Sequence, residues 1–398
     1  MESTYADRTD PWGLAFSPDW EQDAPLTVEA CRRAYEHAMP FTLGAEEELM
    51  LVDAGLDLAP AVDEVLSLLD GDSRFARELR ASQIELVTPV CATAADACRE
   101  LASARRLLVE RLDGGYSLLG CGTHPFSSRY GDVTEAERYR MIADEYVWVA
   151  TRSLMSGLHV HVALPGADSA LAVHNALRSY LPELAALATN SPYFEGRDTG
   201  MSSMRPKLNA FYPRSGIPPA FPSWDDFVAF VDWGRSGGLF PDASHFWWDL
   251  RLHPGLGTLE IRTADAQTRV EDASAQIALA HALVVHLARR VEAGDPPPVH
   301  EQHRIEENAW RAHRYGVRGW LVDLDTGERV PTRTRIEALL DELAPLADEL
   351  GSAEVLEGAR VLLAGNGADR QRYVCEREGY RGLVRWLVGE TQGSALDA

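Results

Sequence analysis

Short segments in which apolar and polar residues alternate recur along the first two thirds of the chain, and this pattern is typical of half-buried β-strands. Longer segments between them carry apolar residues at every third or fourth position, as amphipathic helices do. The alternating pattern predicts strands at 41–53, 81–90, 116–125 and 157–165, and a hairpin at 245–265 that turns at 254–257. The helical pattern predicts helices at 27–39, 62–70, 93–112, 135–150, 169–190 and 271–292, a further helix starting at 223, and a mostly helical remainder.

The order of these elements predicts the fold class. Strands and helices follow one another without the regular rhythm of βαβ units, and at least one hairpin is present, so we expect an α+β fold with an antiparallel sheet. No repeat or low-complexity linker divides the chain, which predicts a single catalytic domain at 39–398 after an N-terminal extension at 1–38. Thr134 and Glu137 have the spacing of a capping box for the helix at 135–150. The irregular segment 191–222 is typical of a binding loop or a lid.

The predicted strand at 41–53 contains three consecutive acidic residues where apolar ones would be expected. Side chains alternate between the two faces of a strand, so Glu46 and Glu48 project from one face and Glu47 from the apolar face. Moving a carboxylate out of water costs several kcal/mol unless a nearby cation or hydrogen-bond donors compensate its charge. We therefore expect a structural ion pair at Glu47, and a cation beside Glu46 and Glu48.

Three further predicted strands repeat this arrangement of an apolar face and a charged or metal-binding face. Glu85 lies between apolar neighbours in the second strand. His159 and His161 are two residues apart, so both rings share one face of their strand. Glu260 and Arg262 have the same spacing in the hairpin. The four strands together predict a polar site on one face of the sheet, opposite the core.

The residue types indicate what such a site could bind. Mg²⁺ prefers carboxylate oxygens and keeps water or phosphate oxygens as its remaining ligands, and arginine presents a planar, permanently charged group to phosphate oxygens. Carboxylates, metal and arginine in one place are typical of phosphoryl transfer. Each residue alone also has a structural interpretation: the glutamates and Arg262 could form ion pairs between strands, and the histidines could be hydrogen-bonded core residues.

The composition of the chain indicates which partners and which cellular compartment to expect. The 398 residues carry a net charge of −23, which argues against nucleic-acid binding because that needs a basic surface. The five cysteines show no disulfide or C-x-x-C spacing, as expected in a reducing compartment. The chain has neither a signal-peptide pattern nor an apolar run long enough for a membrane span. We therefore expect a cytoplasmic protein that binds neither nucleic acid nor membrane.

The chain resembles the bacterial carboxylate–amine ligases grouped with type-2 glutamate–cysteine ligases. The resemblance runs from about Phe41 to Asp323 and rests on six blocks in order: "GAEEELMLVD", "IELVTPV", "GLHVHVAL", "NSPYFEGRDTG", "HFWWDLRLHPGLGTLEIRTADAQT" and "ENAWRAHRYGVRGWLVD". It implies an antiparallel sheet lined by helices, similar in fold to glutamine synthetase and the guanidino kinases. It also implies that ATP phosphorylates a substrate carboxylate and that an amine attacks the acyl phosphate to form an amide, such as a γ-glutamyl bond.

The same resemblance implies roles for individual residues. The implied cofactors are ATP and Mg²⁺, with Glu46, Glu48, Glu85, His159 and Glu260 as metal ligands or their near neighbours. Catalytic roles would fall to Arg262, beside the transferred phosphoryl group, to Glu48, and to Arg205 in a substrate and phosphate loop. Arg262 would also bind the nucleotide, together with Lys207, Asn308 and Arg311. Whether His161 is a ligand stays open.

The segment after "GRDTG" departs from the family pattern. It reads "MSSMRPKLNAFYPRSGIPP", where the family usually has an aromatic-rich run and a Pro-Thr-Ala-Gly turn. This loop is expected to help select the small-molecule carboxylate and amine. Besides the nucleotide role for Lys207, Lys207 and Arg214 could hold a second carboxylate or be solvated loop charges. The aromatic "HFWWDLRLHP" allows a homo-oligomer, with Trp247 and Trp248 either in the core or at an interface.

Two alternatives to the ligase remain at the level of sequence. His159 and His161 with nearby acids would also suit a metal-dependent amide hydrolase. However, amidohydrolase barrels normally place such a histidine pair in their first strand and follow it with regular βα units. The other alternative is a non-catalytic homologue that binds nucleotide. Amide cleavage without ATP would favour the first, and ATP binding without ADP release would favour the second.

Overall fold

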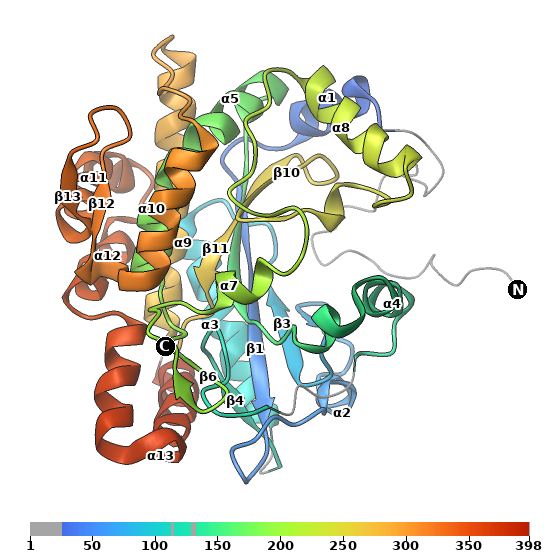
Figure 1. Ribbon diagram of the computed structural model, residues 1–398, viewed down its shortest axis with the longest axis vertical. Coiled ribbons are helices and arrows are strands. Elements are labelled where there is room, and N and C mark those ends of the chain that lie inside the picture. Colours follow the sequence, from blue (N-terminus) through green and yellow to red (C-terminus); the bar gives the residue numbers. More distant parts are fainter. Residues whose placement is uncertain (1–25, 113–114, 129–132, 398) are drawn as a thin grey trace, which may run out of the picture.

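The protein is described here by a computed structural model over residues 26–112, 115–128 and 133–397. A seven-stranded sheet runs in the order β10-β11-β5-β1-β3-β2, and β4 also pairs with β1. Every pairing in this sheet is antiparallel, which confirms the predicted α+β class. Figure 1 shows β1 running through the middle of the molecule with helices around the sheet.

The strands of the main sheet, apart from β2, lie close to the predicted positions. Their bounds are β1 (Leu43–Val52), β2 (Phe75–Arg77), β3 (Gln83–Val87), β4 (Ser117–Leu119), β5 (Gly157–Ala163), β10 (Leu250–His253) and β11 (Thr258–Asp265). Three two-stranded pairs lie outside it: β6 (Tyr193–Phe194) with β7 (Arg197–Asp198), β8 (Ser215–Gly216) with β9 (Trp247–Trp248), and β12 (Trp320–Val322) with β13 (Arg329–Pro331).

The helices account for most of the rest of the described chain. They are α1 (Val28–His37), α2 (Val62–Ser67), α3 (Ala94–Arg111), α4 (Glu137–Thr151), α5 (Ala167–Leu177), α6 (Leu181–Leu187), α7 (Arg205–Asn209), α8 (Trp224–Ser236), α9 (Val270–Glu292), α10 (Gln302–Tyr315), α11 (Thr332–Glu349), α12 (Ala353–Ala364) and α13 (Gly367–Asp397). Single turns of 3-10 helix occur at Arg178–Tyr180, Ala243–His245 and Gly316–Arg318. No helix in the described ranges is long and apolar enough to cross a membrane.

One face of the sheet forms the hydrophobic core. The odd-numbered residues of β1, such as Leu43 and Leu49, are buried in the same apolar cluster as Leu101 and Leu108 of α3 and Leu283 of α9. Burial of such side chains stabilises the fold by roughly 1.5–3 kcal/mol each. The opposite face of the sheet, which carries the even-numbered residues of β1, is called the site face below.

Glu47 is the acidic member of the apolar face, and it has the ion pair that the sequence predicts. Its two carboxylate oxygens accept hydrogen bonds from the Arg105 guanidinium of α3, and both side chains are fully buried. Arg105 also donates to the carbonyl oxygens of Thr268 and Gln267, at 3.1 and 2.6 Å. This bidentate pair therefore fixes α3 both to β1 and to the chain that follows β11.

Two details differ from the sequence predictions. The predicted helix at 169–190 is divided into α5 and α6, because Pro182 lacks the backbone N–H that a continuous helix would need there. The predicted capping box is wrong: α4 follows Ala136, and the Thr134 hydroxyl donates to the carbonyl oxygen of Glu78 instead.

The predicted extension at 1–38 falls mainly outside the described residues. Its described part, from Leu26 on, includes α1, and the Cys31 and Tyr35 side chains of that helix are fully buried in the main core. The Tyr35 hydroxyl donates to the carbonyl oxygen of Thr258 at the start of β11. A domain boundary at residue 38 stays a prediction.

Candidate active site

The strand register places the predicted site residues on the site face. Glu260 of β11 pairs with His161 of β5, and His161 in turn pairs with Gly44 of β1. The next rows of the sheet pair His159 with Glu46, and Glu48 with Glu85. Because paired residues in an antiparallel sheet project from the same face, these side chains share one surface although they come from four strands.

Glu46, His161 and Glu260 form the tightest group in this row of strands. Their potential ligand atoms lie within 4.8 Å of one another. The His161 Nε2 is 3.2 Å from Glu46 Oε1 and 3.7 Å from Glu260 Oε1. Two carboxylates and one imidazole fit a divalent cation that keeps further positions for phosphate oxygens. The sequence had left His161 open, and the structure includes it in this group.

Two arginines compensate the Glu260 carboxylate, which is fully buried. The Arg251 Nε is 2.5 Å from Glu260 Oε2, and an Arg262 nitrogen contacts the other oxygen. Burial alone would raise the pKa of this carboxyl, but the two guanidinium charges outweigh burial and hold the pKa well below its usual range. Glu260 is therefore an anion at neutral pH.

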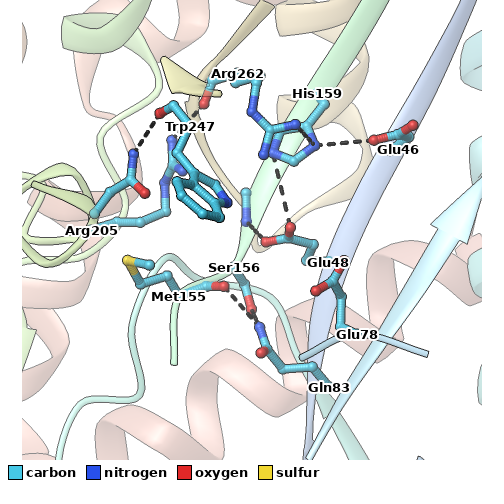
Figure 2. A network of polar contacts seen from close by, with 12 residues as sticks. Glu46, Glu48, Glu78, Gln83, Met155, Ser156, His159, Arg205, Trp247 and Arg262 are labelled. Atoms are coloured by element: carbon cyan, nitrogen blue, oxygen red, sulfur yellow. Dashed lines mark hydrogen bonds and ion pairs between the residues drawn. The ribbon is translucent and has the colours of Figure 1, made fainter. Parts of the chain in front are cut away.

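His159 lies between the glutamates on the site face. Its Nδ1 is 3.1 Å from Glu46 Oε2, 4.0 Å from Glu260 Oε1 and 3.4 Å from an Arg262 nitrogen, and its Nε2 is 3.9 Å from Glu48 Oε1. Burial and the Arg262 charge lower the pKa of His159 to about 4. The ring is therefore neutral at pH 7, and a neutral imidazole can bind a metal ion or donate a hydrogen bond. Figure 2 shows it beside Glu46 and Arg262.

Glu48 is less fully compensated than Glu46 and Glu260. Its Oε2 accepts a hydrogen bond of 2.6 Å from the Gly157 backbone N–H. Burial, reinforced by the negative charge of Glu78, raises the pKa of Glu48 to about 8. Figure 2 shows Glu78 close to it. Glu85 is opposite Glu48 in the sheet and half-buried, but it lies outside the group of Glu46, His161 and Glu260.

Arg205 enters the site from α7, at the start of the loop that the sequence assigned to substrate selection. Its Nε is 3.0 Å from the Asp265 carboxylate and its terminal nitrogen donates to the Arg262 carbonyl oxygen at 2.8 Å. Asp265 also accepts hydrogen bonds from the hydroxyls of Ser191 and Ser203, at 2.7 and 2.8 Å. These contacts tie the loop to the end of β11, so that Arg205 lies next to Arg262 (Figure 2).

Two of the other predicted nucleotide-binding residues, Asn308 and Arg311, lie on α10. Asn308 is buried, and its side-chain amide pairs with both backbone groups of Val322, at 2.7 and 2.8 Å. The Arg311 guanidinium stacks on the Trp320 ring at 3.4 Å. Both contacts connect α10 to β12, so both residues have a structural role. Their nucleotide-binding roles stay predictions.

The structure also shows the surroundings of Arg214 in the loop and of Trp247 and Trp248. Arg214 is not a solvated charge: it donates to the His245 carbonyl oxygen and the Tyr146 hydroxyl, at 3.1 and 3.0 Å, and it lies over the Trp247 ring. Trp248 is 6% exposed and belongs to the core, whereas Trp247 is partly buried beside the site. Much of the aromatic area in this segment is therefore used within the chain, and a homo-oligomer stays a prediction.

Sequence reasoning missed Arg251, Glu78 and Asp249. Arg251 had a usable signal, because a hairpin that turns at 254–257 places residue 251 opposite Glu260, and the observed register is the same. Glu78 follows the short strand β2, which the alternation of residues did not predict. Asp249 lies between β9 and β10, where the chain passes from one sheet to another, and the pattern of a single hairpin hid this change.

The chain is similar in sequence to known proteins over most of its length. The profile of glutamate–cysteine ligase family 2 (GCS2) matches residues 42–390. "Putative glutamate--cysteine ligase 2-1" of Rubrobacter xylanophilus is 42% identical over 362 residues, which cover 88% of this chain and 95% of the relative. "Putative glutamate--cysteine ligase 2" of Sorangium cellulosum is 39% identical over 364 residues, with 88% and 96% covered.

Two solved structures are similar in fold. The glutamate–cysteine ligase of Francisella tularensis in complex with AMP has a TM-score of 0.66 and 14% identity, with 92% of this chain and 91% of that chain covered. A bifunctional glutathione synthetase from Pasteurella multocida has a TM-score of 0.62 and 15% identity, with 92% and 54% covered. At this level of identity the likeness concerns the fold alone.

Proposed function

The chain belongs to glutamate–cysteine ligase family 2, and from this premise we propose that it uses ATP and Mg²⁺ to join a carboxylate to an amine through an acyl phosphate. Membership of the family makes the chain a carbon–nitrogen ligase, which leaves no support for the hydrolase or for the non-catalytic homologue. The nucleotide, the metal and the intermediate are the parts that we propose.

One observation carries the proposal. Carboxylates and histidines from β1, β5 and β11 meet on the site face directly beside the guanidinium groups of Arg262 and Arg205. Glu46 and Glu260, with His161, are suited to hold Mg²⁺, which would offset the negative charge of ATP and of the transferred phosphoryl group. Glu48, Glu85 and His159 line the same face and are the remaining proposed ligands.

The arginines have a separate role in this proposal. Arg262 presents a fixed positive charge to the phosphoryl group, and Arg205 extends that charge toward the substrate loop. Arg251 stays paired with Glu260, so Glu260 keeps one permanent counter-charge while Arg262 contacts the phosphoryl group. Such fixed donors stabilise charge that develops during transfer, because they do not have to reorganise.

The finer parts of the assignment follow from the family. We propose a fold of the glutamine synthetase and guanidino kinase type, amino acids as the substrate class, a γ-glutamyl amide as the product class, and a cytoplasmic location. The names of the relatives specify glutamate and cysteine for those proteins, and both are the first substrates to test on this chain.

The test is ADP release by the purified protein with ATP, Mg²⁺, L-glutamate and L-cysteine, followed by other small carboxylates crossed with amines. We expect release to require both Mg²⁺ and a carboxylate. Glu46→Gln should abolish it, and Glu260→Gln should do the same, while the exposed Glu354→Gln should not.

Folding is controlled separately, because Glu260 is buried between two arginines. Thermal unfolding of both variants shows whether they are folded, and titration with Mn²⁺ followed by electron paramagnetic resonance shows whether they still bind metal. A folded Glu46→Gln variant with wild-type ADP release and wild-type Mn²⁺ affinity would refute the metal assignment. Absence of ADP release from the wild type with every carboxylate would refute the ligase mechanism.

A further inference from the structure

Asp249 is a buried acid between β9 and β10. It is 5% exposed, and its carboxylate makes no hydrogen bond or ion pair with any of the described residues. Its backbone is fully paired, because its N–H donates to the Gly216 carbonyl oxygen and its carbonyl accepts from the Arg262 N–H, both at 2.8 Å. The main chain therefore holds Asp249 next to Arg262, whose guanidinium lies at the proposed phosphoryl site.

Lys207 is the matching cation. It is the only lysine in the chain, where the other 37 of the 38 basic residues are arginines. The side chain is half-buried, and its ammonium group lies 4.6 Å from the centre of the Trp310 ring but makes no hydrogen bond or ion pair with the described residues. Burial lowers the pKa of Lys207, and the charge of Asp249 acts in the opposite direction. Lys207 and Asp249 thus influence each other without forming a direct ion pair.

His313 is a third buried polar side chain in the same region. It is 4% exposed, and neither ring nitrogen has a hydrogen-bond partner among the described residues. Burial and the charges of Lys207 and Arg205 hold the pKa of His313 well below its usual range, so the ring is neutral. Buried polar groups are rarely left unpaired, because a group that loses its water without gaining a partner destabilises the folded state.

These groups are complementary to a molecule with one positive and one negative end. Asp249 suits an ammonium group, and Lys207 suits a carboxylate, with neutral His313 able to donate a hydrogen bond. Asp249 adjoins Arg262 through the backbone, whereas Lys207 extends toward Trp310 of α10. A ligand bound in this orientation directs its amino group toward the phosphoryl site and its carboxylate away from it.

We propose that Asp249, Lys207 and His313 form the subsite for the acceptor amino acid, and that Asp249 takes a proton from its ammonium group. This rests on the proposed ligase function and adds to it the residues that bind the acceptor and the base that activates it. Asp249 keeps the amine close to the acyl phosphate, and Lys207 selects amines that also carry a carboxylate.

The acceptor ammonium gives one proton to the Asp249 carboxylate, and the freed lone pair attacks the carbonyl carbon of the acyl phosphate. A C–N bond forms and the C–O bond to phosphate breaks, with its electron pair leaving on phosphate. The second nitrogen proton leaves with phosphate, and Asp249 later releases its proton to solvent. Burial raises the pKa of the Asp249 carboxyl, although Arg205, Lys207 and Arg262 act against it, and this favours proton uptake.

Hydroxylamine separates this proposal from the function on which it rests. It attacks acyl phosphates as a largely neutral nucleophile at pH 7, so hydroxamate formation from L-glutamate reports the phosphoryl step without the acceptor subsite. In Asp249→Asn we expect amide formation with L-cysteine to fall about 100-fold or more, as for loss of a general base. Hydroxamate formation should stay within about threefold of wild type, a barrier change of less than ~1 kcal/mol. The exposed Asp225→Asn serves as the matched control.

Lys207 is tested by acceptor choice. Wild type should use L-cysteine and L-alanine in preference to cysteamine and ethylamine, which lack the carboxylate. In Lys207→Met the KM for the amino acids should rise roughly tenfold or more, as for loss of a charged hydrogen bond. An equal fall in hydroxamate formation would instead assign Lys207 to the nucleotide and refute its place in the acceptor subsite. Calorimetric titration with L-cysteine and cysteamine should show the same loss of preference in binding.

The outcomes are distinct. No hydroxamate or ADP from the wild type with any carboxylate refutes the ligase mechanism and, with it, this subsite. Wild-type amide formation by a folded Asp249→Asn variant refutes Asp249 as the acceptor base. Equal loss of amide and hydroxamate in that variant assigns Asp249 to the carboxylate donor instead and refutes the proposal. Preference of the wild type for alkylamines refutes the role of Lys207.

Discussion

Replacement of Arg105 by methionine tests the interpretation of the buried ion pair on the apolar face of the sheet. The change removes both hydrogen bonds to Glu47 and both hydrogen bonds to the carbonyl oxygens that follow β11. Glu47 is fully buried, so its carboxylate would be left in the core without a counter-charge. Breaking such a pair from one side costs about 3–5 kcal/mol.

The expected change in melting temperature follows from the size of the protein. At about 2.1 cal/mol/K per residue, the unfolding entropy of a chain of this length is roughly 0.8 kcal/mol/K. A loss of 3–5 kcal/mol then lowers the melting temperature by roughly 4–6 °C. Thermal unfolding followed by far-ultraviolet circular dichroism, with urea unfolding at 25 °C for the free energy, measures both quantities.

The control lies on the same helix. Arg111 contacts Asp70 at 3.2 Å, but both side chains are largely exposed, so Arg111→Met should cost no more than about 1 kcal/mol. A double variant, Glu47→Leu with Arg105→Leu, should recover part of the loss because no charge is left buried, although two carbonyl oxygens still lose their donors. Equal stability of Arg105→Met and wild type would refute the assignment of Glu47 to structure.

Three further predictions concern pH, packing and thiols. Burial raises the pKa of Glu48 from 4.5 to about 8, so between these two values the folded state keeps a proton that the unfolded state loses. The free energy of unfolding should therefore fall as pH rises from 5 to 8. Urea unfolding should show a smaller fall for Glu48→Gln. Gly234→Ala would place its Cβ 1.8 Å from the Phe240 ring and should cost about 1–3 kcal/mol in urea unfolding, whereas Gly389→Ala, with open space around it, should not. Ellman's reagent should modify Cys375 alone in the native protein, because the other four cysteines are buried, and all five in urea.

The strands and the polarity of their faces could be predicted from sequence because both depend on nearby residues. Alternation along β1 fixed which side each of Glu46, Glu47 and Glu48 would face, and the structure agrees for all three. The polar spacing in β5 and β11 placed His159, His161, Glu260 and Arg262 on one face in the same way. The period of a strand is a local property, so it needs no knowledge of the partners.

Contacts that depend on chain crossings could not be predicted in this way. Asp249 belongs to the site because β9 pairs with β8 while β10 pairs with β11, and no local pattern shows where one sheet ends and the next begins. The predicted role of Lys207 was ambiguous for the same reason, since its neighbours Trp310 and Asp249 come from distant segments. Such contacts depend on tertiary packing, which a single sequence does not encode locally.

The buried glutamates on the two faces of β1 are compensated in different ways. This difference supports a structural role for Glu47 and a chemical role for the glutamates of the site face. Glu47 has a permanent bidentate partner in Arg105, which holds α3 in place. The site face instead holds Glu48 without an arginine partner of its own among the described residues, and burial raises the pKa of this carboxyl to about 8, so it keeps a proton near pH 7. A divalent cation beside Glu46 and Glu48 would displace that proton, and the phosphate oxygens of a nucleotide would then replace Glu260 as the partner of Arg262. In the proposed ligase, metal and nucleotide would thus each favour the binding of the other before phosphoryl transfer.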